Sequence, residues 1–338
     1  MRRAPAPAPA LRAPAIAVAL ALLAPAIARA QEPAPSGPPP APTAAPAPPP
    51  PVPTITMAAT AVLRAGGEQF VVRRRSFRLQ GVMTPAVPGQ RVRLVVHRDG
   101  ERIRTVGARV RPDGTFSRRI PTRRVGRISV RALHVATPEL GAARGPKVSV
   151  SVFAAWLSDG ARGPLVRALQ DGLARLRYAV PRNGSYDAAT GRAVMAFRKV
   201  NHLAWRYYAD RRVISKVLGG RGAFEPRHPD AGHHVEADIS RQVLALIEGG
   251  EVVATYHTST GAPSTPTILG SFRVYLKTPG TNVKGMVHSS YFIRGYAIHG
   301  YVDVPAFNAS HGCLRVPIPD SWRIYTWIRI GDRVITYP

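Results

Sequence analysis

The chain has 338 residues, which is enough for two or three domains with sizeable cores. It carries 47 Lys and Arg against 19 Asp and Glu, a net charge of +28, which predicts attraction to polyanions; a solvated basic surface with no specific partner would explain the same count. Cys313 is the only cysteine, which excludes an internal disulfide.

The first 30 residues have the pattern of a secretory signal. Three arginines stand near the start, and the apolar run Ile16 to Leu23 is too short for a comfortable membrane span. A small-x-small cleavage site follows at Ala28 to Ala30. We therefore predict export to the cell wall or periplasmic space, with no stable membrane span after cleavage; an uncleaved anchor is the alternative. Export argues against nucleic acid as the partner and favours anionic wall polymers, anionic lipid head groups or peptidoglycan carboxylates.

Residues 31–53 form a Pro/Ala-rich tract that lacks the apolar side chains needed for a core, so we predict a stiff linker. From residue 54 to 154 the pattern changes to short strands. Val92, Leu94 and Val96 alternate with polar residues, and Asp99-Gly100 predicts a hairpin turn. Several such strands at regular spacing predict an antiparallel, immunoglobulin-like β-sandwich. No catalytic constellation stands out in it.

Residues 157–209 have a helical period. Leucines recur at helical spacing over Gly163 to Tyr178, and Asp187 is placed to cap a second helix. Together with Gly184-Ser185-Tyr186-Asp187, this pattern resembles the small helical peptidoglycan-binding domain, which implies contact with glycan strands. An ordinary helical hairpin is the alternative. Residues 210–234 are expected to be a connecting loop. Its histidines, with Glu236 just beyond, are too loosely spaced for a metal site, so none is predicted.

The last part of the chain, residues 235–338, reads as a mostly antiparallel β domain. Strands are expected at the following segments: Glu236 to Glu248, Val252 to Thr258, Phe272 to Leu276, Tyr291 to Ile293, Tyr296 to His299 and Arg333 to Tyr337. A short helix is expected at Trp322 to Trp327.

The lone cysteine lies in the segment Ser310-His311-Gly312-Cys313-Leu314-Arg315, and His299-Gly300 stands just ahead of it. A lone thiol is a buried hydrophobe, an intermolecular bridge or a nucleophile. A neighbouring base that takes its proton makes it a strong nucleophile, and His299 is the candidate.

These two pieces, HG followed by SHGCxR, resemble the active-site signature of the L,D-transpeptidases of the YkuD family. A second block agrees with the first in order and content: Ser259-Thr260-Gly261, then Thr265-Pro266-Thr267, then Gly270-Ser271-Phe272. The resemblance covers residues 235–338 and implies a YkuD-like β-sandwich as the catalytic domain. The whole chain is then a multi-domain protein, with this domain preceded by the helical domain and the immunoglobulin-like sandwich.

The resemblance also implies roles for individual residues. Cys313 is the nucleophile and His299 the general base, held by a backbone carbonyl in place of a carboxylate. The N–H groups of Gly312 and Cys313 are the expected oxyanion donors. Substrate contacts are expected from six residues: Tyr291, Arg294, Gly295, Ser310, His311 and Arg315. Residues 285–292 resemble the flap over the site.

The implied reaction is transfer of a peptidoglycan stem peptide. The thiol attacks after the third residue of a tetrapeptide stem, D-alanine leaves, and an amine of a neighbouring stem resolves the thioester into a 3→3 cross-link. No cofactor is required. Two alternatives stay open: a carboxypeptidase that uses water as acceptor, and a non-catalytic wall-binding protein.

Overall fold

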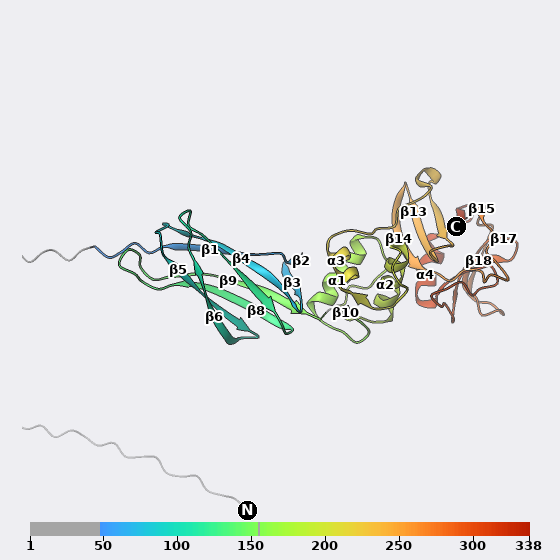
Figure 1. Cartoon of the computed structure of the whole chain (residues 1–338). Coiled ribbons are helices and arrows are strands. Elements are labelled where there is room, and N and C mark those ends of the chain that lie inside the picture. Colours follow the sequence, from blue (N-terminus) through green and yellow to red (C-terminus); the bar gives the residue numbers. More distant parts are fainter. Residues whose placement is uncertain (1–47, 155) are drawn as a thin grey trace, which may run out of the picture. The chain divides into compact units, whose positions relative to one another are not determined.

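The computed structural model describes residues 48–154 and 156–338 (Figure 1). The predicted signal peptide and most of the predicted linker lie outside these residues. Within the described ranges, no helix has both the length and the apolar character to cross a membrane.

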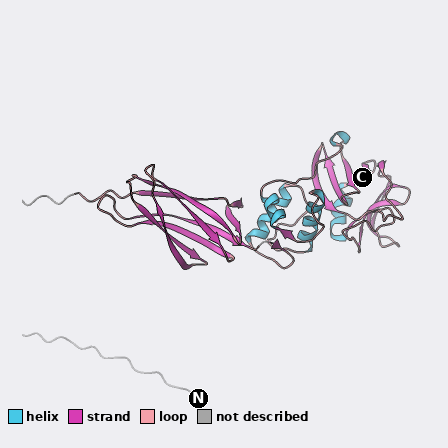
Figure 2. Cartoon of the chain, in the orientation of Figure 1, coloured by secondary structure: helices cyan, strands magenta, loops and turns pink. Residues whose placement is uncertain are grey.

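The segment from Thr54 to Phe153 contains strands only (Figure 2). The strands are β1 Thr54–Thr60, β2 Leu63–Ala65, β3 Glu68–Val72, β4 Arg75–Thr84, β5 Arg91–Arg98, β6 Glu101–Arg109, β7 Thr115–Thr122, β8 Gly126–His134 and β9 Ala143–Phe153. One sheet has the order β1-β4-β7 and the other the order β2-β3-β9-β8-β5-β6. All their pairs are antiparallel except β3 with β9.

The two sheets enclose one apolar core because alternate residues of each strand point inward. Val92, Leu94 and Val96 of β5 are fully buried, as their alternation predicted, and they share a core with Phe77 and Leu79 of β4. The expected Asp99-Gly100 turn is present, with both residues at positive φ. The two-layer arrangement agrees with a β-sandwich, while the immunoglobulin-like topology stays a prediction.

Three helices follow. They are α1 Pro164–Arg175, α2 Ala188–Val200 and α3 Arg211–Leu218, with the short strands β10 Trp156–Leu157 and β11 Ala209–Asp210 paired beside them. The predicted cap of α2 is confirmed, since the Asp187 carboxylate accepts from the Thr190 N–H at 2.8 Å.

Helix α3 was not expected, because residues 210–234 were predicted to be a loop. Asp210 caps it by accepting from the Val213 N–H at 3.0 Å, and Val213, Ile214 and Val217 are buried. A helix of eight residues carries too few apolar repeats for its period to stand out from a single sequence.

The remaining elements build two further sheets. They are β12 His234–Asp238, β13 Val243–Glu248, β14 Glu251–His257, β15 Gly270–Arg273, β16 Leu276–Thr281, β17 Val287–Ile293, β18 Tyr296–Tyr301, β19 Leu314–Pro317 and β20 Arg333–Tyr337, with the 3-10 turn η1 Pro229–Ala231 and helix α4 Ile318–Trp327. The sheet orders are β14-β13-β12-β20-β15 and β16-β17-β18-β19. Two pairs, β12 with β20 and β18 with β19, are parallel.

The single strand expected from Glu236 to Glu248 is wrong. The chain turns at residues 239–242 and returns as β13, paired antiparallel with β12. The turn is held by Asp238, whose carboxylate accepts from the Ser240 hydroxyl and the Arg241 N–H, both at 2.8 Å, and Gln242 adopts φ 57°. Asx-type turns of this kind need no glycine or proline, so the sequence hid the break. Likewise, the strand expected from Phe272 to Leu276 is interrupted between β15 and β16.

The five-stranded sheet lies between two apolar cores. Val243, Ala245 and Ile247 of β13 share a core with the helices, while Leu244 and Leu246 face the core of the C-terminal sheets. This alternation fixes the register of β13 between the two layers.

A buried lysine joins α2 to the same sheet. The Lys199 Nζ lies 2.8 Å from the Nδ1 of His257, 3.1 Å from the carbonyl oxygen of Gln242 and 3.2 Å from that of Thr258. It also lies 5.0 Å from the centre of the Trp205 ring. Burial lowers the pKa of Lys199 to about 6, so at neutral pH the amine is mostly uncharged and has two N–H donors to share among these three acceptors.

Candidate active site

The parallel pairing of β18 and β19 brings the two halves of the motif together. Ile298 lies opposite Leu314 and His299 opposite Arg315. Cys313, which directly precedes β19, therefore lies beside Ala297, two residues before His299 on β18. Eleven residues separate Tyr301 from Cys313 in the chain, but the strand pairing places the two segments side by side in space.

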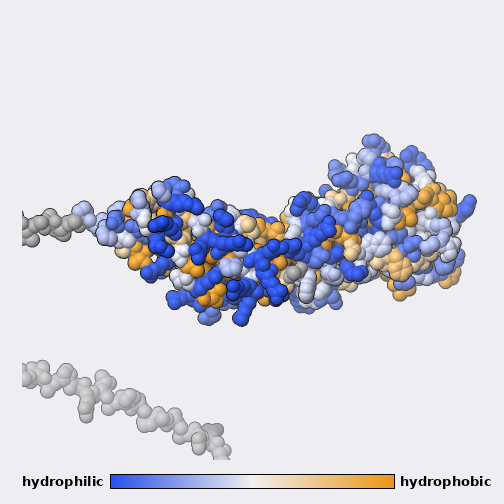
Figure 3. Space-filling view, viewed as in Figure 1, coloured by the Kyte–Doolittle hydropathy of each residue, from blue (hydrophilic) through white to orange (hydrophobic). Residues whose placement is uncertain are grey.

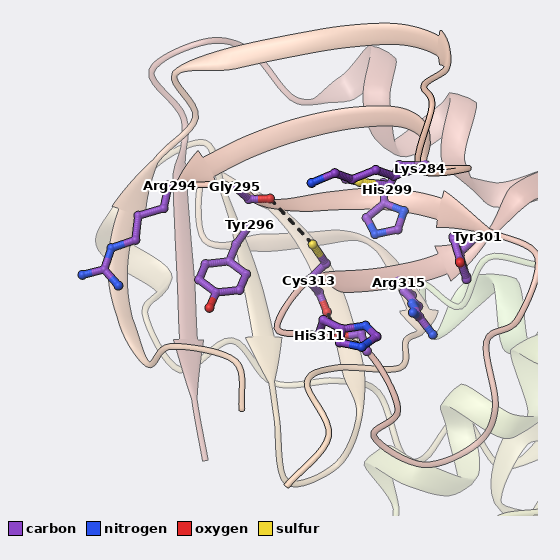
Figure 4. A pocket seen from close by; sticks show the side chains of 11 residues that line it. Lys284, Arg294, Gly295, Tyr296, His299, Tyr301, His311, Cys313 and Arg315 are labelled. Carbon is purple, nitrogen blue, oxygen red and sulfur yellow. Dashed lines mark hydrogen bonds between the residues drawn. The ribbon is translucent and has the colours of Figure 1, made fainter. Parts of the chain in front are cut away.

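The two side chains face one pocket of about 450 Å³ (Figure 4). It is lined by Lys284, Met286, Arg294, Gly295, Tyr296, His299, Tyr301, Ser310, His311, Cys313 and Arg315. Three of these side chains are permanent cations, from Lys284, Arg294 and Arg315. An anionic group that enters the pocket therefore meets positive charge from two turns and from strand β19.

The His299 ring is oriented by a backbone carbonyl. Its Nδ1 lies 2.9 Å from the oxygen of Gly300, so Nδ1 carries the proton and donates it to the carbonyl, which leaves Nε2 as an acceptor. The side chain is 3% exposed. Burial lowers the pKa of His299 to about 4; the Gly300 carbonyl raises it and nearby Arg315 lowers it further. The imidazole is thus neutral at physiological pH and ready to accept a proton.

The Cys313 thiol is half-buried, and its Sγ lies 3.9 Å from the carbonyl oxygen of Gly295. Burial raises the pKa of Cys313, opposed by the Ala297 backbone N–H and by the positive charges of Arg315 and Lys284. A raised thiol pKa beside a lowered imidazole pKa means that the resting pair is thiol and neutral imidazole.

The loop that carries the cysteine depends on Gly312. Its φ is 107°, and a Cβ there would lie 2.1 Å from the Tyr296 ring. The Ser310 hydroxyl closes the same loop, because it donates to the Cys313 carbonyl at 2.6 Å and accepts from the Gly312 N–H at 3.1 Å. The Gly312 N–H, an expected oxyanion donor, is therefore shared with Ser310 in this state.

The second sequence block, residues 259–272, contacts the loop that carries the cysteine. Thr265 donates from its hydroxyl to the Ser310 carbonyl at 3.0 Å, and Thr267 donates to the Gly312 carbonyl at 2.9 Å. Two threonine hydroxyls thus hydrogen-bond to the backbone of the cysteine loop and hold it in place. Gly261 must lack a side chain, since a Cβ would lie 2.3 Å from the Thr265 carbonyl.

Most of the residues expected to touch substrate line this pocket, and one does not. Arg294, Gly295, Ser310, His311 and Arg315 belong to the lining listed above, although the Ser310 hydroxyl is engaged within its loop. Tyr291 is not part of the lining formed by the described residues. It lies on β17, and its hydroxyl accepts from the Asn282 side chain at 3.2 Å.

Three lining residues were missed from the sequence: Lys284, Tyr296 and Tyr301. A further lining residue, Met286, lies within residues 285–292, the segment expected to form the flap over the site. Tyr296 and Tyr301 bracket the motif histidine at its two sides, which is the one signal that pointed to them. The Tyr301 ring lies under the Arg315 guanidinium, with 4.1 Å between the ring centre and the central carbon. Lys284 and Met286 come from the β16–β17 turn, which only folding brings here.

The histidines of the connector serve the fold. Glu236 accepts from the Tyr337 hydroxyl at 2.8 Å and from the N–H groups of Arg227 and His228 at 2.9 and 2.6 Å, and His234 lies 3.4 Å from it. In residues 48–154 and 156–338, no three His, Cys, Asp or Glu side chains are grouped as metal ligands would be.

Comparison with known proteins agrees with this geometry. Residues 232–336 match the YkuD family, described as the L,D-transpeptidase catalytic domain. A solved L,D-transpeptidase from Xylanimonas cellulosilytica is 32% identical, with a TM-score of 0.51; the match covers 54% of this chain and 97% of that one. The catalytic domain of an L,D-transpeptidase from E. faecium is 22% identical, with a TM-score of 0.28, over 32% of this chain and 98% of that one. A search of curated proteins found no match.

The matched segment contains both halves of the motif and the strands that pair them. The match to the Xylanimonas protein covers nearly all of the solved chain, which is residues 123–326 of that protein. The chain therefore belongs to the L,D-transpeptidase family and carries its YkuD catalytic domain.

Proposed function

We propose that this protein forms 3→3 cross-links in peptidoglycan through a thioester on Cys313, with His299 as the general base. The observation that carries the proposal is the hydrogen bond from the His299 Nδ1 to the Gly300 carbonyl, 2.9 Å long. It leaves Nε2 free to take a proton, in a pocket that also holds the thiol.

The chemistry follows from this arrangement. Nε2 takes the thiol proton while the sulfur attacks the carbonyl carbon of the third stem residue, and the bond to the terminal D-alanine breaks. The imidazolium returns its proton to the leaving amine. An amine of a second stem then attacks the thioester, gives up a proton to His299, and leaves with a new amide bond while the thiol is restored.

The neutral resting pair suits this sequence. A thiol kept protonated by burial is less open to oxidation and off-target alkylation than a free thiolate. Arg315 and Lys284 oppose that burial effect, so they favour the thiolate as it forms. We assign the transient oxyanion to the N–H of Cys313 and, once it is released from Ser310, that of Gly312.

The substrate contacts come from the cations around the pocket. Arg315 is held in place by the Tyr301 ring, and its guanidinium has a planar fork suited to a stem carboxylate. Arg294 stands on the β17–β18 turn at φ 50°, with its carbonyl accepting from the Tyr275 hydroxyl. His311, exposed at the mouth, is proposed as a further contact with the stem.

The other parts of the chain fit an enzyme that works on the cell wall. We propose that residues 1–30 direct export and that residues 157–209 hold the enzyme on glycan strands. The division into linker, sandwich, helical domain and catalytic domain, at residues 31–53, 54–154, 157–209 and 235–338, is part of the same proposal.

Mass spectrometry of muropeptides tests the reaction. Tetrapeptide-bearing muropeptides are incubated with the processed protein, with Cys313→Ala as the matched control. Dimers joined 3→3 that are absent from the control would support the proposal. Tripeptides with free D-alanine and no dimers would instead identify a carboxypeptidase. No change that depends on Cys313, together with no penem adduct on Cys313, would identify a binding protein and overturn catalysis.

A further inference from the structure

The positive charge of the chain is concentrated far from the active-site motif in sequence. Residues 49–154 hold 20 Lys and Arg but 5 Asp and Glu, so less than a third of the chain carries more than half of its +28 net charge. Figure 3 shows much of the visible surface over strands β1–β9 as hydrophilic. Such an excess in a stable sandwich calls for a partner, since self-repulsion destabilises a compact fold.

Part of this charge lines a groove of about 510 Å³ on the outer face of the six-stranded sheet. Strand pairing places the lining residues: Arg131 of β8 lies opposite Lys147 of β9, and Leu133 lies opposite Arg144. Arg102 of β6 lies opposite His97 of β5. Four cations therefore stand on neighbouring strands around the groove, with Val95 and Leu133 among its apolar lining residues.

These cations are not neutralised by the protein. In the described part of the chain, the one ion pair recorded between residues 49 and 154 joins Arg127 to Glu68, at 3.6 Å. Of the other carboxylates there, three accept from groups outside the groove: Asp99 from Arg127 N–H, Asp113 from Thr115 and Glu139 from Gln90. None of the five acidic residues lines the groove.

The arrangement is costly to the fold. Like charges directly opposite each other on paired strands destabilise a sheet, and here Arg131 faces Lys147 while Arg91 faces Arg109. A strand face that only needed to be soluble would mix charges of both signs. Positive pairs also occur outside the groove, as Arg78 opposite Arg119 shows, so a pair by itself does not mark a site. Inside the groove, an anionic ligand between Arg131 and Lys147 would relieve their repulsion.

We propose that this groove binds a linear polymer that carries phosphate groups along its chain. The cations fall in three successive rows, Arg102, then Arg131 with Lys147, then Arg144, and rows two residues apart on a strand are spaced by roughly 6.6 Å. A chain with a charge on every repeat finds a cation at each step. Arginine supplies three of the four cations, and its donor fork matches two oxygens of one phosphate.

Other anionic partners fit the groove less well. No Phe, Tyr or Trp lines it, so nucleic-acid bases would have nothing to stack on. A bilayer surface is flat, whereas these cations surround a hollow. The inference does not depend on the proposed transpeptidation, because the groove belongs to a different sheet from the catalytic motif.

Fluorescence anisotropy with labelled inorganic polyphosphate tests the proposal on the processed full chain. The groove variant combines Arg102→Gln, Arg131→Gln, Arg144→Gln and Lys147→Gln. We expect its affinity to fall at least about tenfold, and the slope of log K against log salt to fall by about 3. The control variant removes four charges at exposed positions on or just before the three-stranded sheet: Arg73→Gln, Arg75→Gln, Arg78→Gln and Arg119→Gln. Its affinity should stay within about threefold.

Equal losses of affinity for polyphosphate in the two variants would overturn the groove as the binding site and leave only diffuse electrostatic attraction. Equally tight binding to polyglutamate, or binding only to phosphatidylglycerol vesicles, would overturn the phosphate polymer as occupant. Arg131→Gln alone guards against a folding artefact: it relieves the pair with Lys147, so its Tm should rise by about 1–4 °C while affinity falls. Transpeptidation of soluble muropeptides should be unchanged in all of these variants, which separates this inference from the proposed function.

Discussion

At the scale of single residues, the site consists of a thiol and an imidazole that burial keeps neutral. Desolvation penalises the charged form of each, so it raises the pKa of Cys313 and lowers that of His299. In the proposed reaction, the nucleophile is thus held in its neutral form between turnovers. The positive charges of Arg315 and Lys284 lower the pKa of Cys313 against the effect of burial, and so favour the thiolate.

The pH dependence of acylation follows from these shifts. Because the pKa of His299 is about 4, the base is deprotonated from weakly acidic pH upward, and the rate of Cys313 acylation by a penem should rise through pH 4 and be level near pH 7. The acylation rate constant, followed by absorbance from pH 3.5 to 9, gives the profile. An inflection at pH 6.5 would show an imidazole with an ordinary pKa and contradict the neutral pair.

The glycine before the cysteine makes a second prediction. Gly312→Ala places a methyl group 2.1 Å from the Tyr296 ring at a residue with φ 107°. We expect acylation to fall by about 100-fold, because a displacement of about 1 Å in a catalytic loop costs that much. Gly331→Ala is the matched control: its φ is 93°, and nothing lies within 4 Å of the added carbon. It bears a similar backbone penalty and should acylate at the wild-type rate.

At the scale of elements, the active site depends on strands paired across long stretches of chain. The β18–β19 pairing brings the two halves of the motif together. Helix α2 contacts the five-stranded sheet through Lys199, which bonds to Gln242, just before β13, and to His257 of β14. His257 continues this link, since its Nε2 lies 3.1 Å from the Val304 carbonyl, in the segment that leads to the cysteine loop.

Removing the buried lysine should therefore loosen the helix–sheet contact. Lys199→Met leaves the Gln242 and Thr258 carbonyls and the His257 Nδ1 without a donor, and we expect a loss of about 3 kcal/mol in the free energy of unfolding. Urea denaturation followed by tryptophan fluorescence measures it. Arg175→Met, at an exposed helix position, is the control and should change stability by less than about 0.5 kcal/mol. Equal stability of the two variants would show that Lys199 does not stabilise the contact between helix α2 and the sheet.

At the scale of the whole molecule, buried histidines make stability depend on pH. The pKa of His299 is about 4 and that of His257 about 3, both lowered chiefly by burial. Between each of these values and 6.5, the unfolded chain binds a proton that the folded protein does not.

The contribution of these two histidines to stability should therefore be full above pH 6.5 and decline as the pH falls toward 4. His299 alone accounts for up to about 3 kcal/mol of this decline. Urea unfolding at pH 7, 5.5 and 4.5 gives the slope of the unfolding free energy against pH. In His299→Gln this slope should be shallower. A variant with the same slope as the wild type would mean that His299 titrates normally in the folded protein.

The sequence was informative wherever a feature is local. The capping aspartate of α2, the Asp99-Gly100 turn and the alternation of β5 each depend on residues a few positions apart, and all three are present. The break at residues 239–242 and helix α3 were missed, because a side-chain-stabilised turn and a short helix leave weak periodic signals. Tyr291 was expected to contact substrate from a loose resemblance; it lies on β17 and is not among the residues that line the pocket.

By itself, the sequence determined the chemistry that the protein carries: one thiol, a motif histidine, two ordered blocks and a strong positive charge. Only the tertiary structure decided how these groups act. It brought Lys284 to the pocket, turned the threonines of the second block onto the cysteine loop, and aligned the arginines of separate strands around one groove. The physical reason is that pairing and burial join residues far apart in the chain, and burial sets their protonation states.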